Sequence, residues 1–274
     1  MTKPFYDADI AWCPGCGDFP ILRTLDKVLD SMAFDRRKLV LVSGIGQAAK
    51  LPHYTRANVY NGLHGRAVPA AVAIKLCNHD LEVVITSGDG DMYGEGGNHL
   101  IQNIRRNVGV KAFVHNNQVY ALTKGQASPT SDLGFVTPAQ TAGVMAAPFN
   151  PLALAIAEDC SFVARTYAGD PGHMEKMMRA ALEHTGGFAL LDILQPCVTF
   201  NKVNTYQWYR ERVRPIAESH DPYDRGAAFE LALKWGDEIP VGVFYRSRRP
   251  SYESQLAVLK TGTLVSQYGR TGAS

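Results

Sequence analysis

Residues 82–91 read EVVITSGDGD, an apolar run that stops at glycine, aspartate, glycine and aspartate. The run does not alternate between apolar and polar residues, which is typical of a buried strand in a parallel sheet. The two glycines predict a tight turn in which backbone N–H groups can approach an anion closely. A helix-length segment at 95–107 follows, so the N-terminus of that helix can face a phosphate group.

The same order of strand, turn and helix recurs on both sides of this stretch. Alternating strands and helices predict right-handed crossovers and a sheet covered by helices on both faces. We therefore expect an α/β fold with a doubly wound, mostly parallel sheet that binds ligands at the carboxyl ends of its strands. The predicted strands are 39–43, 82–87, 110–115, 162–166, 188–193 and 239–244, and the helices are 65–78, 95–107, 171–184 and 223–235, after a first helix capped by Asp18.

Composition narrows the class of protein. The 274 residues, 46% apolar and 20% charged, predict one folded domain. The sequence becomes rich in Asn, Tyr and Arg after Cys197, so we expect a core at 12–197 and a C-terminal extension at 198–274 that packs on the core or on a partner. A net charge of +2 is too small to suggest nucleic acid. No apolar run approaches the roughly 18 residues of a membrane span, and the first residues lack the apolar core of a signal peptide. We expect a cytoplasmic protein.

Oxygen ligands follow two of the predicted strands. Asp89 ends the 82–87 strand and Asn117 ends the 110–115 strand, with one helix between them. That spacing is one crossover, so both side chains should lie side by side at the carboxyl edge of the sheet. Together with the carbonyl of Val119 they are the hard oxygen donors that Mg²⁺ prefers, leaving positions for two diphosphate oxygens. An ordinary turn with a capping aspartate is the alternative.

Seven motifs occur in a fixed order: WCPGCGD at 12–18, SGIG at 43–46, KLPHY at 50–54, HGR at 64–66, GDG at 88–90, NN at 116–117 and LTKGQASPT at 122–130. In this order they resemble the β subunit of 2-oxoacid:ferredoxin oxidoreductases. The resemblance runs from about residue 12 to residue 197 and continues more weakly through 239–252. The LTKGQ form is similar to the 2-oxoglutarate or broad 2-oxoacid branch of the family.

The resemblance implies that the doubly wound sheet is of the thiamine diphosphate-binding type and carries a site for that cofactor. Its Mg²⁺ ligands map to Asp89, Asn117 and the Val119 carbonyl, which agrees with the interpretation of the spacing. Contacts to the cofactor map to Ile45, Gly46, Gln47, Ala48, His64, Gly90, Asp91, Ala121 and Leu122. The cofactor supplies the difficult chemistry, and the protein orients it.

The resemblance also implies a reaction and its partners. A 2-oxoacid, expected to be 2-oxoglutarate, would be oxidatively decarboxylated to CO₂ and acyl-coenzyme A, with electrons passing through an iron–sulfur cluster to ferredoxin. The glutamate that activates thiamine would come from an α subunit, in an αβ or α2β2 assembly. We do not assign Glu95 as that base, because its position favours the first turn of a helix. The chain would then hold half of an active site.

The predicted cluster site departs from the family pattern. Cys13, Cys16 and Cys197 match three of the four cysteines that hold a 4Fe–4S cluster, but the fourth position falls at Gln47. A glutamine oxygen is a poor substitute for a thiolate on iron. Cys77 and Cys160 are possible replacements, although we expect both to be buried, inert thiols. A cluster with an unusual fourth ligand is favoured over a labile or three-iron cluster, no cluster, or zinc.

Several roles stay open. Lys50 and Lys124 follow glycine-rich turns and are candidate catalytic residues that could neutralise diphosphate, substrate carboxylate or coenzyme A, unless they are merely solvated. A basic surface could dock an acidic ferredoxin; it comprises Lys202, Arg210, Arg212 and Arg214. Two other functions compete with the main interpretation: a non-oxidative thiamine-dependent decarboxylase, suggested by Gln47, and a non-catalytic paralogue, against which the intact Asp89 and Asn117 speak.

Overall fold

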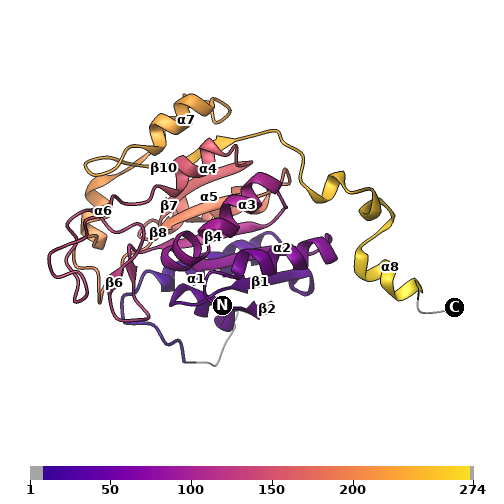
Figure 1. The fold of residues 1–274 in the computed structure, drawn as a ribbon, viewed down its shortest axis with the longest axis horizontal. Helices are drawn as coiled ribbons and strands as arrows, with labels where there is room; N and C mark the ends of the chain where they lie inside the picture. Colours follow the sequence, from indigo (N-terminus) through magenta and orange to yellow (C-terminus); the bar gives the residue numbers. More distant parts are fainter. Residues whose placement is uncertain (1–8, 272–274) are drawn as a thin grey trace.

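The computed structural model describes residues 9–271 and contains an eight-stranded sheet (Figure 1). Neighbouring strands run parallel, except that β10 pairs with β7 in the antiparallel direction. The predicted α/β fold with a mostly parallel sheet is confirmed. In spatial order the strands are β2 (Asn58–Asn61), β1 (Leu39–Ser43), β3 (Glu82–Gly88), β4 (Lys111–Asn116), β8 (Ala189–Leu194), β7 (Phe162–Tyr167), β10 (Ile239–Arg246) and β9 (Val213–Pro215).

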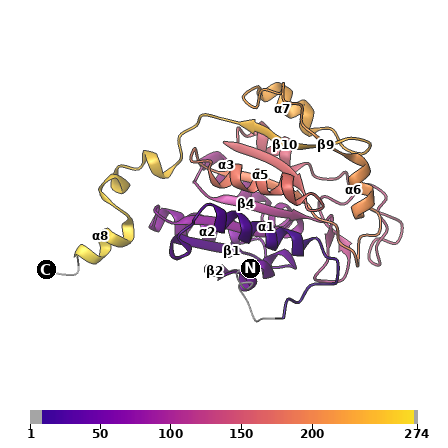
Figure 2. The ribbon, with the colours of Figure 1, turned by 180° about the vertical axis from the view of Figure 1, so that it is seen from behind.

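Helices cover both faces of the sheet (Figures 1 and 2). Helices α1 (Asp18–Ser31) and α5 (Pro171–Leu182) pack together on one face. The opposite face is covered by α2 (Ala67–Cys77), α3 (Gly97–Arg106), α4 (Pro151–Ala157) and α7 (Arg225–Ala232). In β1, Leu39 and Leu41 pack into the apolar core on the face covered by α1 and α5, whereas Val40 and Val42 pack into the core on the opposite face. Two apolar layers explain why the strands are continuously apolar rather than alternating.

The structure adds elements that the sequence analysis did not predict. Strand β2 is an edge strand with four exposed residues, NVYN, so it carries no apolar signal. Helix α6 (Tyr206–Arg212) lies in the polar segment after Cys197, and a two-stranded hairpin joins β5 (Val119–Tyr120) to β6 (Gln126–Ala127). Strands on both sides of residue 197 belong to one sheet, while the proposed division of the chain there stays a prediction.

One predicted cap is wrong. Helix α1 begins at Asp18, with Gly17 at the N-cap and no side-chain cap. The Asp18 carboxylate instead lies 2.6 Å from Nδ1 of His115 and accepts a hydrogen bond from the Cys16 thiol at 3.4 Å. The Asp18 carboxylate therefore bonds the buried His115 near the end of β4 instead of the first N–H groups of α1.

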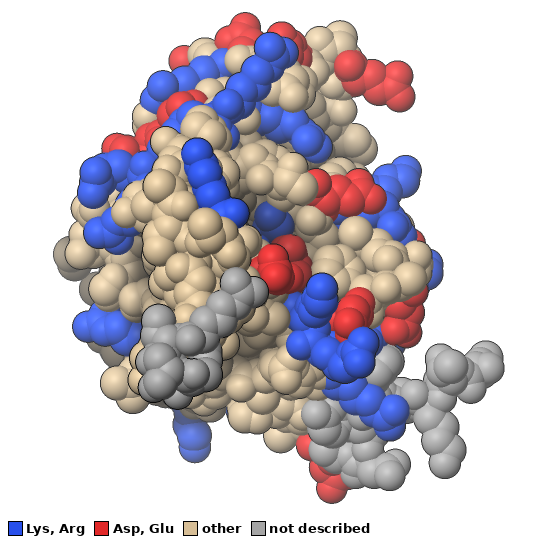
Figure 3. All heavy atoms as spheres, turned by 90° about the vertical axis from the view of Figure 1, so that its right-hand side faces the viewer, with Lys and Arg blue, Asp and Glu red and all other residues tan. Residues whose placement is uncertain are grey.

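The C-terminal segment leaves the sheet after β10. It contains two short 3₁₀ helices, η4 (Glu253–Gln255) and η5 (Ala257–Thr261), and ends in α8 (Leu264–Thr271), which projects away from the sheet (Figures 1 and 2). Acidic and basic side chains are both spread over the face at that side, with uncharged surface between them (Figure 3). Within residues 9–271, no helix is long and apolar enough to cross a membrane.

Candidate active site

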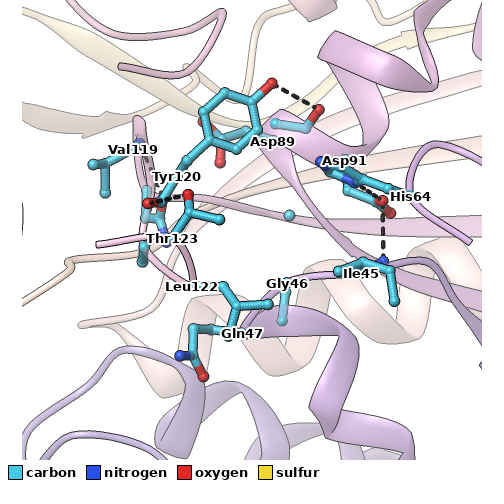
Figure 4. A pocket seen from close by; sticks show the side chains of 15 residues that line it. Ile45, Gly46, Gln47, His64, Asp89, Asp91, Val119, Tyr120, Leu122 and Thr123 are labelled. Carbon is cyan, nitrogen blue, oxygen red and sulfur yellow. Dashed lines mark hydrogen bonds and ion pairs between the residues drawn. The ribbon is translucent and has the colours of Figure 1, made fainter. Parts of the chain in front are cut away.

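The loops after β1, β3 and β4 meet around a cavity of about 510 Å³, here called the β3–β4 cavity (Figure 4). Every residue predicted to contact Mg²⁺ or the diphosphate cofactor lines it, although what they bind stays a prediction. Tyr120 and Thr123 also line it and were not predicted. The full lining is Ile45, Gly46, Gln47, Ala48, His64, Gly88, Asp89, Gly90, Asp91, Asn117, Val119, Tyr120, Ala121, Leu122 and Thr123.

Asp89 is a buried carboxylate whose hydrogen-bond donors are neutral side chains. Its exposed fraction is 2%, and its Oδ2 accepts hydrogen bonds from the hydroxyls of Ser128 at 2.5 Å and Thr130 at 2.6 Å. Burial raises the pKa of Asp89 to about 6 in spite of these donors. A buried carboxylate held by neutral donors is stabilised by a bound cation, so this side chain suits a metal ligand.

Asn117 shapes the turn that brings Val119 to the cavity. Its side-chain oxygen accepts a hydrogen bond from the Val119 N–H at 3.1 Å, and Gln118 between them has a left-handed φ of 58°. Asn201 holds the Asn117 carbonyl at 3.1 Å. An amide oxygen has two lone pairs, so Asn117 can accept this bond and still ligate a cation. Asp89, Asn117 and Val119 thus form a donor set that fits Mg²⁺.

Asp91 organises the cavity wall. Its Oδ1 accepts from the N–H groups of Ile45 at 3.1 Å and Gly65 at 2.7 Å and lies 2.6 Å from His64 Nδ1. Its Oδ2 accepts from the Ser87 hydroxyl at 2.5 Å. A Cβ on Gly44 would lie 2.1 Å from this carboxylate, so only glycine fits there. Asp91 therefore ties the loops of Ile45 and Gly65 to β3, and its predicted contact with the cofactor stays a prediction.

His64, Tyr120 and Glu95 form a polar cluster at the cavity. Glu95 Oε2 accepts from the Tyr120 hydroxyl at 3.0 Å and lies 3.3 Å from His64 Nε2. Burial and Glu95 hold the pKa of Tyr120 well above its usual range, so the hydroxyl stays a donor. The expected first-turn role of Glu95 is wrong, because Glu95 ends the π-helical turn η3 (Gly90–Glu95) before α3 begins.

The two candidate lysines lie outside the lining of the cavity. Lys50, in the 3₁₀ helix η2 (Ala48–Tyr54), has its Nζ 3.4 Å from the Ala11 carbonyl. Lys124 is exposed and has a left-handed φ of 78° in the β5–β6 turn. A catalytic role for either lysine therefore stays a prediction.

A second cavity, of about 340 Å³, contains the cysteines and shares a wall with the first. Cys13, Cys16 and Cys197 line it, and Gln47, Asn117 and Ala121 line both cavities. We call it the cysteine cavity. Its other lining residues are Trp12, Asp18, Gln195, Val198, Thr199 and Phe200.

The possible replacement cysteines lie elsewhere. Cys160 is buried, as predicted, and burial raises the pKa of its thiol to about 12. Cys77 is exposed at the end of α2, so the expectation that it is buried is wrong. Neither lines the cysteine cavity, which leaves Gln47 at the position where a fourth ligand is expected.

Polar atoms in the cysteine cavity lack partners. The side-chain oxygens of Gln47 and Gln195 are buried without a hydrogen bond to any described residue. Burial, followed by the charge of Asp18, raises the pKa of Cys16, and the Gln195 amide donates to its sulfur at 3.4 Å. Buried unpaired acceptors are costly and indicate a missing ligand. Within residues 9–271, no three His, Cys, Asp or Glu side chains are grouped to hold one metal ion, and this includes Cys13, Cys16 and Cys197.

The predicted basic surface lies around α6, next to the cysteine cavity. Lys202 donates to the carbonyl of Val198, which lines that cavity. The Arg212 guanidinium lies 4.6 Å from the centre of the Trp208 ring and pairs with Glu211 at 3.2 Å. Part of the positive charge is thus compensated locally, and docking of ferredoxin here stays a prediction.

Comparison with known proteins agrees with this geometry. The family "Thiamine pyrophosphate enzyme, C-terminal TPP binding domain" matches residues 44–193, and the C-terminal family of the pyruvate ferredoxin oxidoreductase beta subunit matches residues 197–261. The chain is 42% identical over 260 residues to the 2-oxoacid:ferredoxin oxidoreductase subunit beta of Saccharolobus solfataricus, covering 90% of this chain and 85% of that one.

Two further relatives are named for 2-oxoglutarate. The 2-oxoglutarate oxidoreductase subunit KorB of Mycobacterium tuberculosis is 42% identical over 195 residues, covering 71% of this chain and 52% of that one. A solved 2-oxoglutarate:ferredoxin oxidoreductase from Magnetococcus marinus, with 2-oxoglutarate, coenzyme A and succinyl-CoA bound, superposes with a TM-score of 0.91 at 34% identity. The match covers 99% of this chain and 95% of that one.

The fold and these matches define a thiamine diphosphate-binding subunit of an oxidoreductase. More narrowly, the chain belongs to the family of 2-oxoacid:ferredoxin oxidoreductase β subunits. The resemblance drawn from the seven sequence motifs is thereby confirmed.

Proposed function

We propose that the β3–β4 cavity holds thiamine diphosphate through a Mg²⁺ ion bound by Asp89, Asn117 and the Val119 carbonyl. The buried Asp89 carboxylate and the Asn117 turn support this assignment. Asp91 keeps the loops of Ile45 and His64 at fixed positions around the cofactor. When bound, thiamine diphosphate supplies the carbon nucleophile that attacks a 2-oxoacid, and the chain's own residues hold and orient it.

The substrate and partners follow from the relatives. We propose oxidative decarboxylation of a 2-oxoacid, with 2-oxoglutarate as the substrate, coenzyme A as the acyl acceptor and ferredoxin as the electron acceptor. An α subunit supplies the activating glutamate, since Glu95 is engaged by Tyr120 and is absent from the cavity lining.

An iron–sulfur cluster in the cysteine cavity completes the proposal. Cys13, Cys16 and Cys197 would hold it, with Gln47 at the fourth position. The observation that carries the electron-transfer function is the wall shared by the two cavities, which Gln47, Asn117 and Ala121 form. A donor and an acceptor on opposite sides of one layer of side chains are suitably placed for electron transfer.

The test uses the complex purified with its partner subunit in the absence of air. We expect reduction of ferredoxin that depends on 2-oxoglutarate and coenzyme A, faster than with pyruvate, together with bound iron and sulfide. Gln47 favours one competing function, non-oxidative decarboxylation. A colourless, iron-free complex that releases CO₂ without reducing ferredoxin would establish that alternative and reject ours.

A further inference from the structure

A third cavity, of about 560 Å³, lies where the ends of β4 and β7 meet α4 and the end of α7. We call it the Arg165 cavity. None of its lining residues belongs to the β3–β4 cavity or to the cysteine cavity. They are Asn116, Thr130, Pro148, Phe149, Asn150, Pro151, Arg165, Leu233 and Trp235.

The charged residue of this lining is a buried arginine with a free donor. The exposed fraction of Arg165 is 3%, and its Nε donates to Asp192 at 3.2 Å. Its Nη1 is buried and has no hydrogen-bond partner within residues 9–271. A buried guanidinium N–H without an acceptor costs free energy, so a ligand that supplies an acceptor there would be stabilised. A guanidinium has five N–H donors, and Asp192 therefore leaves capacity for a second anion.

The other polar groups of the lining are already used by the protein. Asn116 donates to Asp192 at 3.1 Å and accepts from Thr130 at 2.9 Å. Asn150 accepts from the Ala153 N–H at 3.0 Å and donates to the Ala232 carbonyl at 2.8 Å. The indole N–H of Trp235 donates to Asp132 at 2.9 Å. Arg165 is thus the lining side chain with a donor left for a ligand.

The rest of the wall is apolar. Pro148, Phe149, Pro151 and Leu233 line it, and the Trp235 ring lies 5.5 Å from the Arg165 guanidinium carbon. A concave, mostly apolar site with one oriented charged group is the usual form of a small-molecule site. Its chemistry selects a ligand with one negatively charged group and an apolar body.

We propose that the Arg165 cavity binds a small monocarboxylate. The carboxylate accepts from Arg165 Nη1, and the apolar body lies against Phe149 and Trp235. The free Nη1 can donate a charge-assisted hydrogen bond to one carboxylate oxygen, which is stronger than a bond to a neutral acceptor. This site is separate from the proposed thiamine site and does not depend on it.

The test measures binding to the complex purified with its partner subunit, by calorimetric titration with phenylacetate and with uncharged phenylacetamide. Removing the charge removes a charge-assisted hydrogen bond, so we expect phenylacetate to bind at least about tenfold more tightly. Equal affinity for the two probes, or no binding of phenylacetate, would overturn the proposal.

Two variants locate the binding. Arg165→Met alone would leave the buried Asp192 carboxylate without its cationic partner, so it is combined with Asp192→Asn. Leu233→Trp fills the cavity from a residue that is 50% exposed and leaves the Arg165–Asp192 pair intact. We expect both variants to lower phenylacetate affinity at least about tenfold. Full affinity in the folded Leu233→Trp variant would place the probe elsewhere and reject the site.

Lys234→Met is the matched control. Lys234 lies between Leu233 and Trp235 and pairs with Glu238 at 3.8 Å, but it does not line the cavity. We expect its loss to leave phenylacetate affinity unchanged. A drop as large as that of the Arg165 variant would show general attraction to positive charge rather than a built site. A structure of the complex with an acidic side chain of the partner subunit on Arg165 would also overturn the proposal.

Discussion

The connection from β3 through α3 to β4 has a buried polar residue near each end. One of them faces a cavity, and the other bonds to distant parts of the fold. Asp89 comes directly after β3, and Asn107 follows α3. Asp89 lines a cavity and receives its side-chain donors on one oxygen, Oδ2. Asn107 has no polar atom to spare. Its amide donates to the carbonyls of Gly186 and Pro250, and its oxygen accepts from Ser161 and Phe188.

This difference separates binding from stability. A buried group with an unused lone pair beside a cavity is available to a ligand, whereas a group with all its bonds made to distant segments holds the fold together. Asn107 joins parts of the chain up to 143 positions away. We therefore expect substitutions at the two ends of this crossover to have opposite effects on cofactor affinity and on folding.

The largest effect is expected from Asp89→Ala. Removing the carboxylate removes the charged Mg²⁺ ligand, so thiamine diphosphate affinity should fall at least about a hundredfold. The free energy of unfolding should fall by no more than about 1 to 3 kcal/mol, because the Ser128 hydroxyl loses its carboxylate acceptor while the Thr130 hydroxyl keeps Asn116 as an acceptor. Fluorescence titration of the complex with thiamine diphosphate and Mg²⁺ measures this. Asp224→Ala, which removes an exposed N-cap carboxylate, is the control, and unchanged affinity in Asp89→Ala would refute the metal assignment.

Asn107→Ala should give the converse result. It removes four hydrogen bonds and places alanine at a left-handed φ of 63°, so the free energy of unfolding should fall by about 3 to 5 kcal/mol. Thiamine diphosphate affinity of the folded complex should not change. Urea unfolding measures the first effect and titration the second.

Asn107→Gly separates the two causes, because glycine tolerates this φ at no steric cost. It should recover about 1 kcal/mol of the loss seen with alanine. A large loss of cofactor affinity in either Asn107 variant would contradict the assignment of cofactor binding to Asp89 and of fold stability to Asn107.

The two ends also differ in how far they could be predicted from sequence. Asp89 and Asn117 were predictable because a ligand pair on adjacent strands has a fixed spacing, one crossover, and because glycine marks the turn. Their lining of one cavity, together with Gly46 and His64, follows from the strand order. The parallel sheet was predictable for the same reason, since its buried strands are continuously apolar.

What was missed depends on contacts that no short spacing encodes. The role of Asn107 rests on Gly186 and Pro250, and that of Asp18 on His115, which is 97 positions away. Strand β2 was missed because its residues are exposed at a sheet edge. Tyr120 was missed because nothing local indicates that its ring packs against Gly90, where a Cβ would lie 2.2 Å from it.

Gln47→Cys extends the comparison to the cysteine cavity. The Gln47 oxygen, like Asp89, is a buried polar group beside a cavity with bonding capacity left. A thiolate is a stronger ligand for iron than an amide oxygen, so any cluster should lose its visible absorbance several-fold more slowly in air. Gln207→Cys adds a cysteine at an exposed position outside the cavity and is the control, which should leave the decay unchanged. Equal decay in Gln47→Cys and the unmodified complex would show that Gln47 does not face the cluster.

The smallest expected effect is the change in stability with pH caused by His184, which belongs to the hydrogen-bonded group around Asn107. His184 Nε2 lies 3.1 Å from the Ser161 hydroxyl, which in turn bonds Asn107. Burial, with the charges of Lys111 and Arg246, lowers the pKa of His184 from 6.5 to about 4. The unfolded chain therefore binds a proton more readily, so the stability contributed by neutral His184 is present above pH 6.5 and is lost as the pH falls towards 4. His184→Gln should flatten the fall of the urea midpoint over this range without changing thiamine diphosphate affinity at pH 7. If the urea midpoint falls as steeply in the variant, other groups cause the acid sensitivity, and His184 does not contribute to the stability of the region around Asn107.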